Sequence, residues 1–366
     1  MIVRPDEGGA FEHVTKLSAG IARRGHEVAI CGLEGRVRED FGDAIAPTVE
    51  VLPLKMVRPV SPAPDARSVM KLVAIERRFR PDLVHAHGSK ESALGRLARV
   101  GRPRVPFAYT PHGYAFAKPF MSATERRSYR LLERVLAPFA TRVICICEAE
   151  QRLAAQIGPV SRTRVVHNGI EPPAPDAPDP TAERLRERGP VVCALSGLRA
   201  GKGLETLIAA FAAVIDSHPQ ASLVIAGEGP ERRALEQLAV QAGVAPSVHL
   251  IGEVADVFAV LRAADLFVHP SWAESFPYAV LEAMAGGVPV IATDVGGTGE
   301  AIEAGTSGML VPPQDPAALG DAISELLGDR ELARSFADAA SRRFSERFTL
   351  QRMIEGTLET YAELGI

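Results

Sequence analysis

The chain has 366 residues, of which 46% are hydrophobic and 23% charged, and its sequence contains no low-complexity tract. At about 150 residues per domain this length predicts two domains and excludes a single small binding module, while the composition excludes a disordered chain. The net charge of -4 combines two unlike halves: residues 1–170 hold 27 Lys/Arg and 17 Asp/Glu, a net +10, and the remaining residues hold 14 and 28, a net -14. A basic half favours an anionic acceptor or an anionic membrane surface, with ordinary surface solubility as the alternative.

The N-terminus offers little strand sequence before Pro5. We therefore expect the first strand either to begin upstream of this chain or to be very short. The sequence shows neither a secretory signal nor an apolar run of about 18 residues. A cytoplasmic protein is expected, either free or peripheral at the inner face of the membrane.

Four cysteines are present, at Cys31, Cys145, Cys147 and Cys193. They have neither the density of a disulfide framework nor the paired spacing of a structural zinc site, so reduced thiols are expected. Cys145 and Cys147 alternate within an apolar run and are expected in a core.

Short β-branched runs alternate with amphipathic stretches along the whole chain. This alternation predicts an α/β fold in which parallel sheets are covered by helices. In the first half the expected strands are 27–31, 49–52, 82–85, 107–110, 143–147 and 164–166, with helices such as 10–24 and 124–139. In the second half they are 191–196, 222–226, 248–251, 266–269, 290–292 and 308–311. The helix after Gly203 carries an apolar stripe at the three-and-four spacing of a buried face: Leu204, Leu207, Ile208, Phe211, Val214 and Ile215.

A proline-rich connector separates the halves. Residues 171–180 contain five prolines, which cannot join the interior of a sheet or helix. We therefore predict a first domain over 1–170, a linker over 171–189 and a second domain over 190–345. Residues 346–366 are expected to form a terminal helix that packs back towards the first domain. Two doubly wound domains bind ligands outside the carboxyl ends of their strands, so the chemistry is expected in a cleft between them.

The helix around residues 125–134 is rich in arginine. Arg126, Arg127, Arg130 and Arg134 lie on or near one face, with apolar residues opposite. Such a face suits an anionic lipid or a lipid-linked diphosphate acceptor. An ordinary solvated helix face is the alternative.

The loop 196–203 lies between a predicted strand and a predicted helix. Its free amides and the helix N-terminus favour a phosphate, and Arg199 and Lys202 add positive charge there. A P-loop is excluded, because Ser196 replaces the first required glycine and Gly203 replaces the magnesium-binding Ser or Thr. A dinucleotide fingerprint at residues 227–232 also fails, because its third glycine is missing.

Two glutamates mark the most specific segment, residues 270–287. Glu274 lies in a loop after a strand, and Glu282 lies in the helix that follows. Eight residues at helical rise would separate them by about 12 Å, comparable to the reach from a sugar to a ribose across a diphosphate. Carboxylates accept paired hydroxyl donors, so one could hold a sugar and the other a ribose. A helix-start carboxylate and a solvated face are the structural alternatives.

Glu274, seven intervening residues and Glu282 stand inside PSWAESFPYAVLEAMAGGVPVIATDVGGTGE, which resembles the signature of the retaining glycosyltransferases of family 4. Further segments match that family in order across nearly the whole chain: residues 7–10, 24–28, 84–88, 110–113, 167–170 and 307–313. The resemblance implies the GT-B fold, an α/β architecture with two doubly wound, Rossmann-like domains facing an inter-domain cleft.

The resemblance also implies an activity. It implies transfer of a hexosyl-type sugar from a UDP- or GDP-sugar, with retained anomeric configuration, to a lipid-linked, polysaccharide or other cell-surface glycan. The expected setting is exopolysaccharide or cell-envelope synthesis. No metal and no cofactor beyond the nucleotide-sugar co-substrate are expected, consistent with the lack of a close Asp-x-Asp pair in the sequence. No nucleic-acid partner is expected.

By carry-over from the family, Arg199 and Lys202 would neutralise the leaving diphosphate and Glu282 would hold the ribose. One departure concerns the arginine. The family commonly has it where this chain has Gly197, whereas here it comes two residues later, at Arg199. Lys202 is in register with the family pattern.

The sugar would be held by Glu274 and by the amides of Ser275 and Phe276. Gly8 and Gly9 would let backbone approach the diphosphate, which side-chain-free residues permit. No protein nucleophile is expected.

His112 would lie near the reacting sugar. His87, Arg126 and Arg130 are candidates for the acceptor or sugar side. A structural role is the alternative for each histidine.

Two other functions remain open. A nucleotide-sugar epimerase on the same fold would keep the donor site, although the pair of glutamates argues against it. A catalytically inactive sugar-nucleotide-binding scaffold is suggested by the displaced arginine and the short N-terminus.

Overall fold

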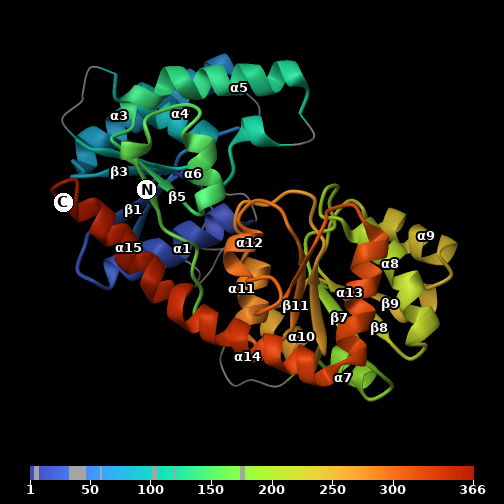
Figure 1. Cartoon of the computed structure of the whole chain (residues 1–366). Helices are drawn as coiled ribbons and strands as arrows, with labels where there is room; N and C mark the ends of the chain where they lie inside the picture. The colour runs from blue at the N-terminus through green and yellow to red at the C-terminus, as the bar shows by residue number, and fades with distance from the viewer. Residues whose placement is uncertain (4–7, 33–46, 58–59, 101–104, 119–120, 174–177) are drawn as a thin grey trace. The chain divides into compact units, whose positions relative to one another are not determined.

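The computed structural model describes residues 1–3, 8–32, 47–57, 60–100, 105–118, 121–173 and 178–366 (Figure 1). It divides into two compact units. Unit 1 comprises Met1–Asn168 and Leu350–Ile366, and unit 2 comprises Gly169–Thr349. Each unit consists of parallel strands accompanied by helices, which confirms the predicted α/β class.

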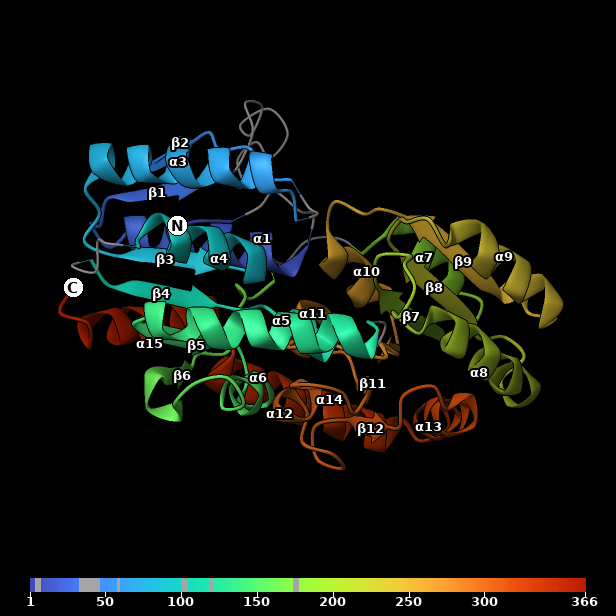
Figure 2. The same ribbon diagram turned by 90° about the horizontal axis from the view of Figure 1, so that it is seen from above.

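Unit 1 carries one parallel arrangement of strands, seen side by side in Figure 2. Its strands are β1 (Val28–Cys31), β2 (Val49–Leu52), β3 (Val84–His87), β4 (Phe107–Thr110), β5 (Arg142–Cys145) and β6 (Thr163–Val165). Ile2 forms parallel bridges to both Cys31 and Ala86, so a very short first strand lies between β1 and β3. The resulting order is β2, β1, Ile2, β3, β4, β5, β6. Successive strands are added on one side of Ile2 as far as β2 and on its other side from β3 onward, so the strand order reverses between Ile2 and β3, as in a doubly wound sheet.

The helices of unit 1 are α1 (Gly9–Ala22), α3 (Pro62–Phe79), α4 (Ser89–Ala98), α5 (Ala123–Leu136), α6 (Glu148–Ala154) and α15 (Leu350–Ala362), with 3-10 turns η2 (Ala115–Ala117), η3 (Ala137–Phe139) and η4 (Val160–Arg162). The C-terminal helix α15 packs on α1 in one apolar core. A Cβ at Gly20 of α1 would lie 2.1 Å from Cδ1 of Ile354, so this glycine lets the two helices approach closely.

Unit 2 has six parallel strands in the order β12, β11, β10, β7, β8, β9. They are β7 (Val191–Leu195), β8 (Ser222–Ala226), β9 (Val248–Gly252), β10 (Leu266–His269), β11 (Val290–Thr293) and β12 (Met309–Val311). The helices are α7 (Pro180–Arg186), α8 (Leu204–Ser217), α9 (Arg232–Gln241), α10 (Val257–Ala263), α11 (Tyr278–Ala285), α12 (Thr298–Ala301), α13 (Pro316–Gly328) and α14 (Arg330–Arg347), with η5 (Ala245–Ser247). This order also reverses once, between β7 and β10.

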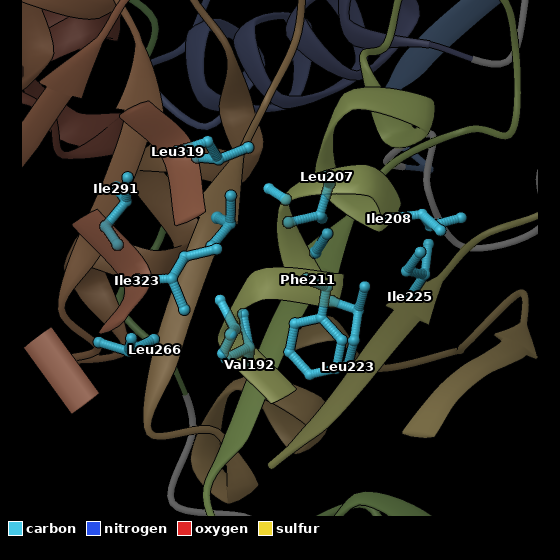
Figure 3. Packing of buried hydrophobic residues seen from close by; sticks show 14 of the residues in the cluster. Val192, Leu207, Ile208, Phe211, Leu223, Ile225, Leu266, Ile291, Leu319 and Ile323 are labelled. Carbon is cyan, nitrogen blue, oxygen red and sulfur yellow. The ribbon is translucent and has the colours of Figure 1, made fainter. Parts of the chain in front are cut away.

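The apolar stripe of α8 forms the centre of the unit 2 core. Leu207, Ile208 and Phe211 are fully buried, and the same core contains Leu223 of β8 and Ile323 of α13 (Figure 3). Truncating a buried Phe such as Phe211 to Ala costs about 3–5 kcal/mol. The stripe predicted from the three-and-four spacing is therefore confirmed, with Ile215 partly buried at its margin.

Several boundaries differ from the sequence predictions. The strand expected at 82–85 runs over Val84–His87, because the backbone of His87 donates to Ile2 of the first strand. The strand expected at 143–147 ends at Cys145, because Cys147 is instead the N-cap of α6, where its Sγ accepts from the backbone of Glu150. All four cysteines are buried, and none forms a disulfide.

The division into units falls between Asn168 and Gly169, close to the predicted boundary at residue 170, and α15 belongs to unit 1. The stretch predicted as a linker contains α7, where Pro180 occupies the first turn and Asp179 caps the helix. Residues 174–177 lie outside the described residues. The cleft between the domains stays a prediction. Within the ranges described above, no helix is both long enough and apolar enough to span a bilayer.

Candidate functional site

The reversal of strand order in unit 2 marks the place where a doubly wound sheet binds a ligand. Strands β7 and β10 are hydrogen-bonded neighbours at this reversal. Residues 196–203 follow β7, and residues 270–277 follow β10. The two loops therefore emerge side by side from the carboxyl edge of the sheet.

The loop after β7 is fixed by backbone contacts. The amide of Leu198 donates to Glu228 O at 2.9 Å, and the amide of Glu231 donates to Leu198 O at 3.0 Å. Gly203, the N-cap of α8, has a φ of 68°, and a Cβ there would lie 1.9 Å from Pro270 O. Only glycine satisfies both constraints, so Gly203 sets how closely the two loops approach.

Lys202 and Glu274 meet across the two loops. Lys202 Nζ donates to Glu274 Oε1 at 2.6 Å, and Ser271 Oγ donates to the same oxygen at 2.9 Å. His269 Nε2 lies 3.4 Å from that oxygen, beyond good hydrogen-bond length. Burial raises the pKa of Glu274, but the neighbouring His269 and Lys202 outweigh it and hold the pKa at about 2. Glu274 is therefore ionised at neutral pH.

The cation of this pair faces solvent more than the anion does. The side chain of Lys202 is 35% exposed and that of Glu274 is 16% exposed. Lys202 is also the only lysine among residues 169–349. An ammonium has three protons to donate, and Glu274 Oε1 accepts one of them. The arrangement is thus able to offer the remaining charge-assisted hydrogen bonds to an anion from solvent.

The loop that carries Glu274 is held from three sides. Thr293 Oγ1 donates to Ser271 O, the amide of Gly297 donates to Ser275 O at 2.7 Å, and Trp272 Nε1 donates to Thr206 Oγ1 at 3.2 Å. Gly296 has a φ of 56°, and a Cβ there would lie 1.8 Å from Glu274 O. The carboxylate is therefore presented by a rigid loop, although it lies outside any helix or strand.

The remaining predicted residues of unit 2 range from buried to exposed. Phe276 is buried against Phe348 with ring centroids 5.5 Å apart, while Ser275 and Glu282 are half-buried. Glu282 lies within α11, but residues 274–277 precede that helix, so the 12 Å estimate based on helical rise does not apply. Arg199 is exposed and lines a cavity of about 320 Å³ with residues of α8 and α9.

Four of the predicted residues of unit 1, two glycines and two histidines, lie at or after the carboxyl ends of strands. Gly8 and Gly9 are exposed at the N-terminus of α1, which follows the first strand. A Cβ at Gly8 would meet no described atom within 4 Å, so the space beside this backbone is open to a ligand. Residues 4–7, including Glu7 of the predicted opening motif, lie outside the described residues.

A cluster of four histidines lies at the strand reversal of unit 1. His85 and His87 come from β3, His13 from α1 and His112 from the loop after β4. His87 Nδ1 lies 3.1 Å from His112 Nε2, and the ring of His13 packs against both. His85 uses both nitrogens, at 2.6 Å from Tyr361 Oη and 2.9 Å from Thr110 Oγ1.

Burial keeps these imidazoles uncharged. Desolvation lowers the pKa of His13 to about 4 and lowers the pKa values of His85, His87 and His112 well below the ordinary value for histidine. At neutral pH the cluster is therefore a set of neutral donors and acceptors. Such groups suit uncharged polar ligands such as sugar hydroxyls.

His112 sits in a braced turn. Its φ of 53° is unusual for a residue other than glycine. The carboxylate of Glu150 in α6 accepts from the amide of Gly113 at 2.6 Å and from the amide of Ile146 at 2.9 Å, which ties the turn to the end of β5. Sequence reasoning missed Glu150 and the partners of the cluster, although the two-residue spacing of His85 and His87 puts both on one face of a strand.

The arginine-rich helix α5 buries a charged side chain and exposes apolar ones. Its Glu133 is buried and accepts from Arg96 at 3.0 Å and from Tyr109 Oη at 2.9 Å. Leu131 and Val135 are instead 63% and 60% exposed. Arg126 and Arg130 are exposed, and the guanidinium of Arg130 lies 5.2 Å from the ring centroid of Phe116.

Two sequence families match the chain. Residues 8–169 match the family described as a glycosyl transferase 4-like domain, and residues 177–343 match the family described as glycosyl transferases group 1. Over 97% of its length the chain is 31% identical to the D-inositol 3-phosphate glycosyltransferase of Geodermatophilus obscurus, of which it covers 85%. The chain belongs to the family-4-like glycosyltransferases. The resemblance predicted from Glu274, Glu282 and the accompanying segments is confirmed.

Other relatives of the glycosyltransferase agree. It is 28% identical to the glycogen synthase of Mycobacterium tuberculosis, over 97% of the chain and 91% of that protein. The crystal structure of Anabaena Alr3699/HepE in complex with UDP-glucose is similar with a TM-score of 0.82 and 25% identity, over 99% of the chain and 98% of that structure. The predicted GT-B fold is confirmed.

Proposed function

We propose that the glycosyltransferase moves a hexosyl-type sugar from a UDP- or GDP-sugar to a glycan or lipid-linked acceptor, with retained anomeric configuration and without a metal ion. The observation that carries this proposal is the pair of Lys202 and Glu274 at the β7–β10 reversal. It puts a solvent-accessible cation and an ionised carboxylate beside each other, which suits a donor whose diphosphate is linked to a hydroxyl-rich sugar.

The cation is proposed to stabilise the leaving group. As the glycosidic bond breaks, negative charge builds on the diphosphate, and a preorganised cation stabilises it. Lys202 takes this role, with Arg199 as a second cation whose exposed side chain is able to move. Glu282 is proposed to hold the ribose.

The carboxylate is proposed to hold the donor sugar. Glu274 is rigidly held and ionised, so it accepts hydrogen bonds from sugar hydroxyls without first losing a proton. The amides of Ser275 and Phe276 complete this half of the proposed site. Because Glu274 already contacts Lys202, donor binding requires Lys202 to exchange that contact for the diphosphate or to share itself between both.

The neutral histidines of unit 1 are proposed to bind hydroxyl groups of the reacting sugar and of the acceptor. His112 and His87 offer uncharged nitrogen atoms to hydroxyl groups. The open space at Gly8, next to the exposed Gly9, admits a ligand beside the backbone of α1. The similar Anabaena protein was crystallised with UDP-glucose, which supports a UDP-sugar in particular.

Helix α5 is proposed to contact an anionic membrane that carries the acceptor. Its exposed Leu131 and Val135 accompany exposed arginines, the combination that interfacial helices use. Arg126 and Arg130 belong to this surface. Co-sedimentation with vesicles tests it: acidic lipid should raise the bound fraction, and binding that ignores lipid charge contradicts it.

Nucleotide binding and product analysis together test the main proposal. UDP or GDP should raise the melting temperature, and the corresponding nucleotide-sugar should yield a glycosylated acceptor whose anomeric configuration matches the donor. Turnover should persist in a chelator. An epimerase would convert the donor sugar without acceptor, and an inactive scaffold would bind the donor without transfer or hydrolysis. Either result overturns the proposed transfer.

A further inference from the structure

Three of the four clustered histidines each bring a ring nitrogen close to those of the other two. The ligand-type nitrogens of His13, His87 and His112 all lie within 4.8 Å of one another, and the closest pair is 3.1 Å apart. His85 differs, because hydroxyl groups occupy both of its nitrogens. The set of three is all imidazole, and every member belongs to unit 1.

The hydrogen bond to Asn168 fixes which nitrogen of His13 carries a lone pair. His13 Nδ1 is 3.0 Å from Asn168 Oδ1, which accepts only, so Nδ1 carries the proton and Nε2 is left with a lone pair. A second partner of this kind is how proteins orient metal-binding histidines. His87 is 1% exposed, and its Nδ1 faces His112 Nε2 at 3.1 Å, so one of these two nitrogens carries a lone pair and the other a proton.

The donor set selects the ligand. Neutral imidazoles bind late first-row divalent cations, whereas magnesium and calcium require oxygen ligands. Three histidines with an open fourth position form one of the established zinc arrangements.

We propose that His13, His87 and His112 form a binding site for a divalent transition-metal ion, with zinc as the reference ion and water in the fourth position. A tetrahedral zinc ion separates its nitrogen ligands by about 3.4 Å, close to the 3.1 Å between His87 Nδ1 and His112 Nε2. The widest separation, 4.8 Å, must shorten by about 1.4 Å, a movement within the reach of side-chain rotation. His112 is only half-buried and gives the ion access from solvent.

Metal binding at this site competes with transfer. The contact between His87 and His112 is replaced by bonds from both rings to the ion, so neither ring remains available to a sugar or acceptor. The ion is therefore a reversible inhibitor and not a cofactor. This consequence rests on the proposed function of His112, whereas the metal site itself does not.

The test uses the full-length chain, freed of metal with a chelator and then titrated with cobalt or zinc alone. We expect one site per chain, with the visible absorption of tetrahedral cobalt, and zinc should displace the cobalt. Replacing a ligand by His13→Phe or His87→Phe should weaken zinc binding by about 100-fold or more. The matched control is His26→Ala, an exposed histidine of the same unit, which should leave affinity unchanged.

If a phenylalanine variant unfolds, His13→Gln serves in its place, since glutamine is smaller and able to hydrogen-bond Asn168. Equal affinity in wild type and both ligand variants overturns the site, as does the absence of binding tighter than about 100 µM. In parallel, zinc should inhibit transfer by wild type and by His26→Ala, and EDTA should restore it. Zinc that binds at the histidines without inhibiting transfer would refute the role of His112 and leave the metal site standing.

Discussion

The two units share a strand order but differ in the charge of what they display at its reversal. In unit 2 the reversal carries Lys202 and Glu274, an ion pair whose members retain contact with solvent. In unit 1 it carries four imidazoles kept neutral by burial. Related topology therefore presents a charged pair in one unit and uncharged rings in the other.

This difference matches the chemistry expected of each ligand. A diphosphate gains charge in the reaction and needs a fixed cation, which a partly exposed ammonium supplies without a large desolvation penalty. A sugar hydroxyl gains no full charge, and a neutral imidazole serves it in a buried site where an imidazolium would be unstable. The same reasoning predicts that the units respond to pH in different windows.

Acid should destabilise unit 1 first. The pKa of His13 is about 4 in the folded chain and near 6.5 in an unfolded chain, so the folded state binds fewer protons between these values. The contribution of His13 to the free energy of unfolding is complete above pH 6.5 and is lost as the pH falls towards 4. A shift of this size corresponds to about 3 kcal/mol for one group, and three neighbours shift in the same direction.

The site of unit 2 should lose its contribution to stability at a lower pH than unit 1. The folded pKa of Glu274 is about 2, so its contribution is present above pH 4.5 and is lost as the pH falls towards 2. Hydrogen exchange of β3 and β4 peptides reports on unit 1, and the fluorescence of Trp272, the only tryptophan, reports on unit 2. His13→Gln should move the unit 1 transition to lower pH. Simultaneous loss of both signals near pH 6 would contradict the comparison.

Removing the cation should have the next largest effect. Lys202→Ala should lower turnover by about 10²-fold or more, since one preorganised donor to a developing anion is worth about that factor. It should also weaken binding of the nucleoside diphosphate. Lys202→Arg keeps the charge and should retain more activity than the alanine variant.

Arg233→Ala is the matched control, because Arg233 is an exposed cation of the same unit on α9. Steady-state kinetics with a saturating acceptor measure all three variants. Near-normal turnover in Lys202→Ala would remove the cation from the mechanism, and an equal loss in Arg233→Ala would show that net charge alone is responsible.

Sequence reasoning located most of the framework of both units. The expected strands 49–52, 107–110, 222–226 and 266–269 coincide with β2, β4, β8 and β10, because short apolar runs bounded by turn residues fix buried strands locally. It also selected Lys202 and Glu274, each from its own loop, and the structure brings these two side chains together although they are far apart in sequence. Their roles towards a donor came from the resemblance to a family and stay predictions.

The histidine cluster shows what local patterns miss. His13 lies on a helix, His112 lies in a turn and Tyr361 lies near the C-terminus, and only the strand order and the packing of α15 on α1 bring them together. Glu133 was missed for a related reason. Its helix has the composition of an exposed surface, and the burial of this carboxylate depends on Arg96, which comes from another helix.

One helix-capping glycine from each unit offers the finest comparison. Gly203 caps α8 after the first strand of unit 2, and Gly88 caps α4 after β3 of unit 1, with φ values of 68° and 95°. Alanine at either position should cost about 1–3 kcal/mol in free energy of unfolding, because positive φ is unfavourable for a residue with a Cβ. The surroundings then separate the two.

A Cβ at Gly203 would lie 1.9 Å from a backbone oxygen, whereas one at Gly88 would lie 2.4 Å from Oε2 of Glu91, the end of a flexible side chain. A backbone oxygen moves aside only if the whole loop shifts, so Gly203→Ala should cost more. It should also separate Lys202 from Glu274 and reduce turnover. Thermal unfolding with the two unit-specific probes measures the costs, and a greater loss for Gly88→Ala would contradict the close loop contact in unit 2.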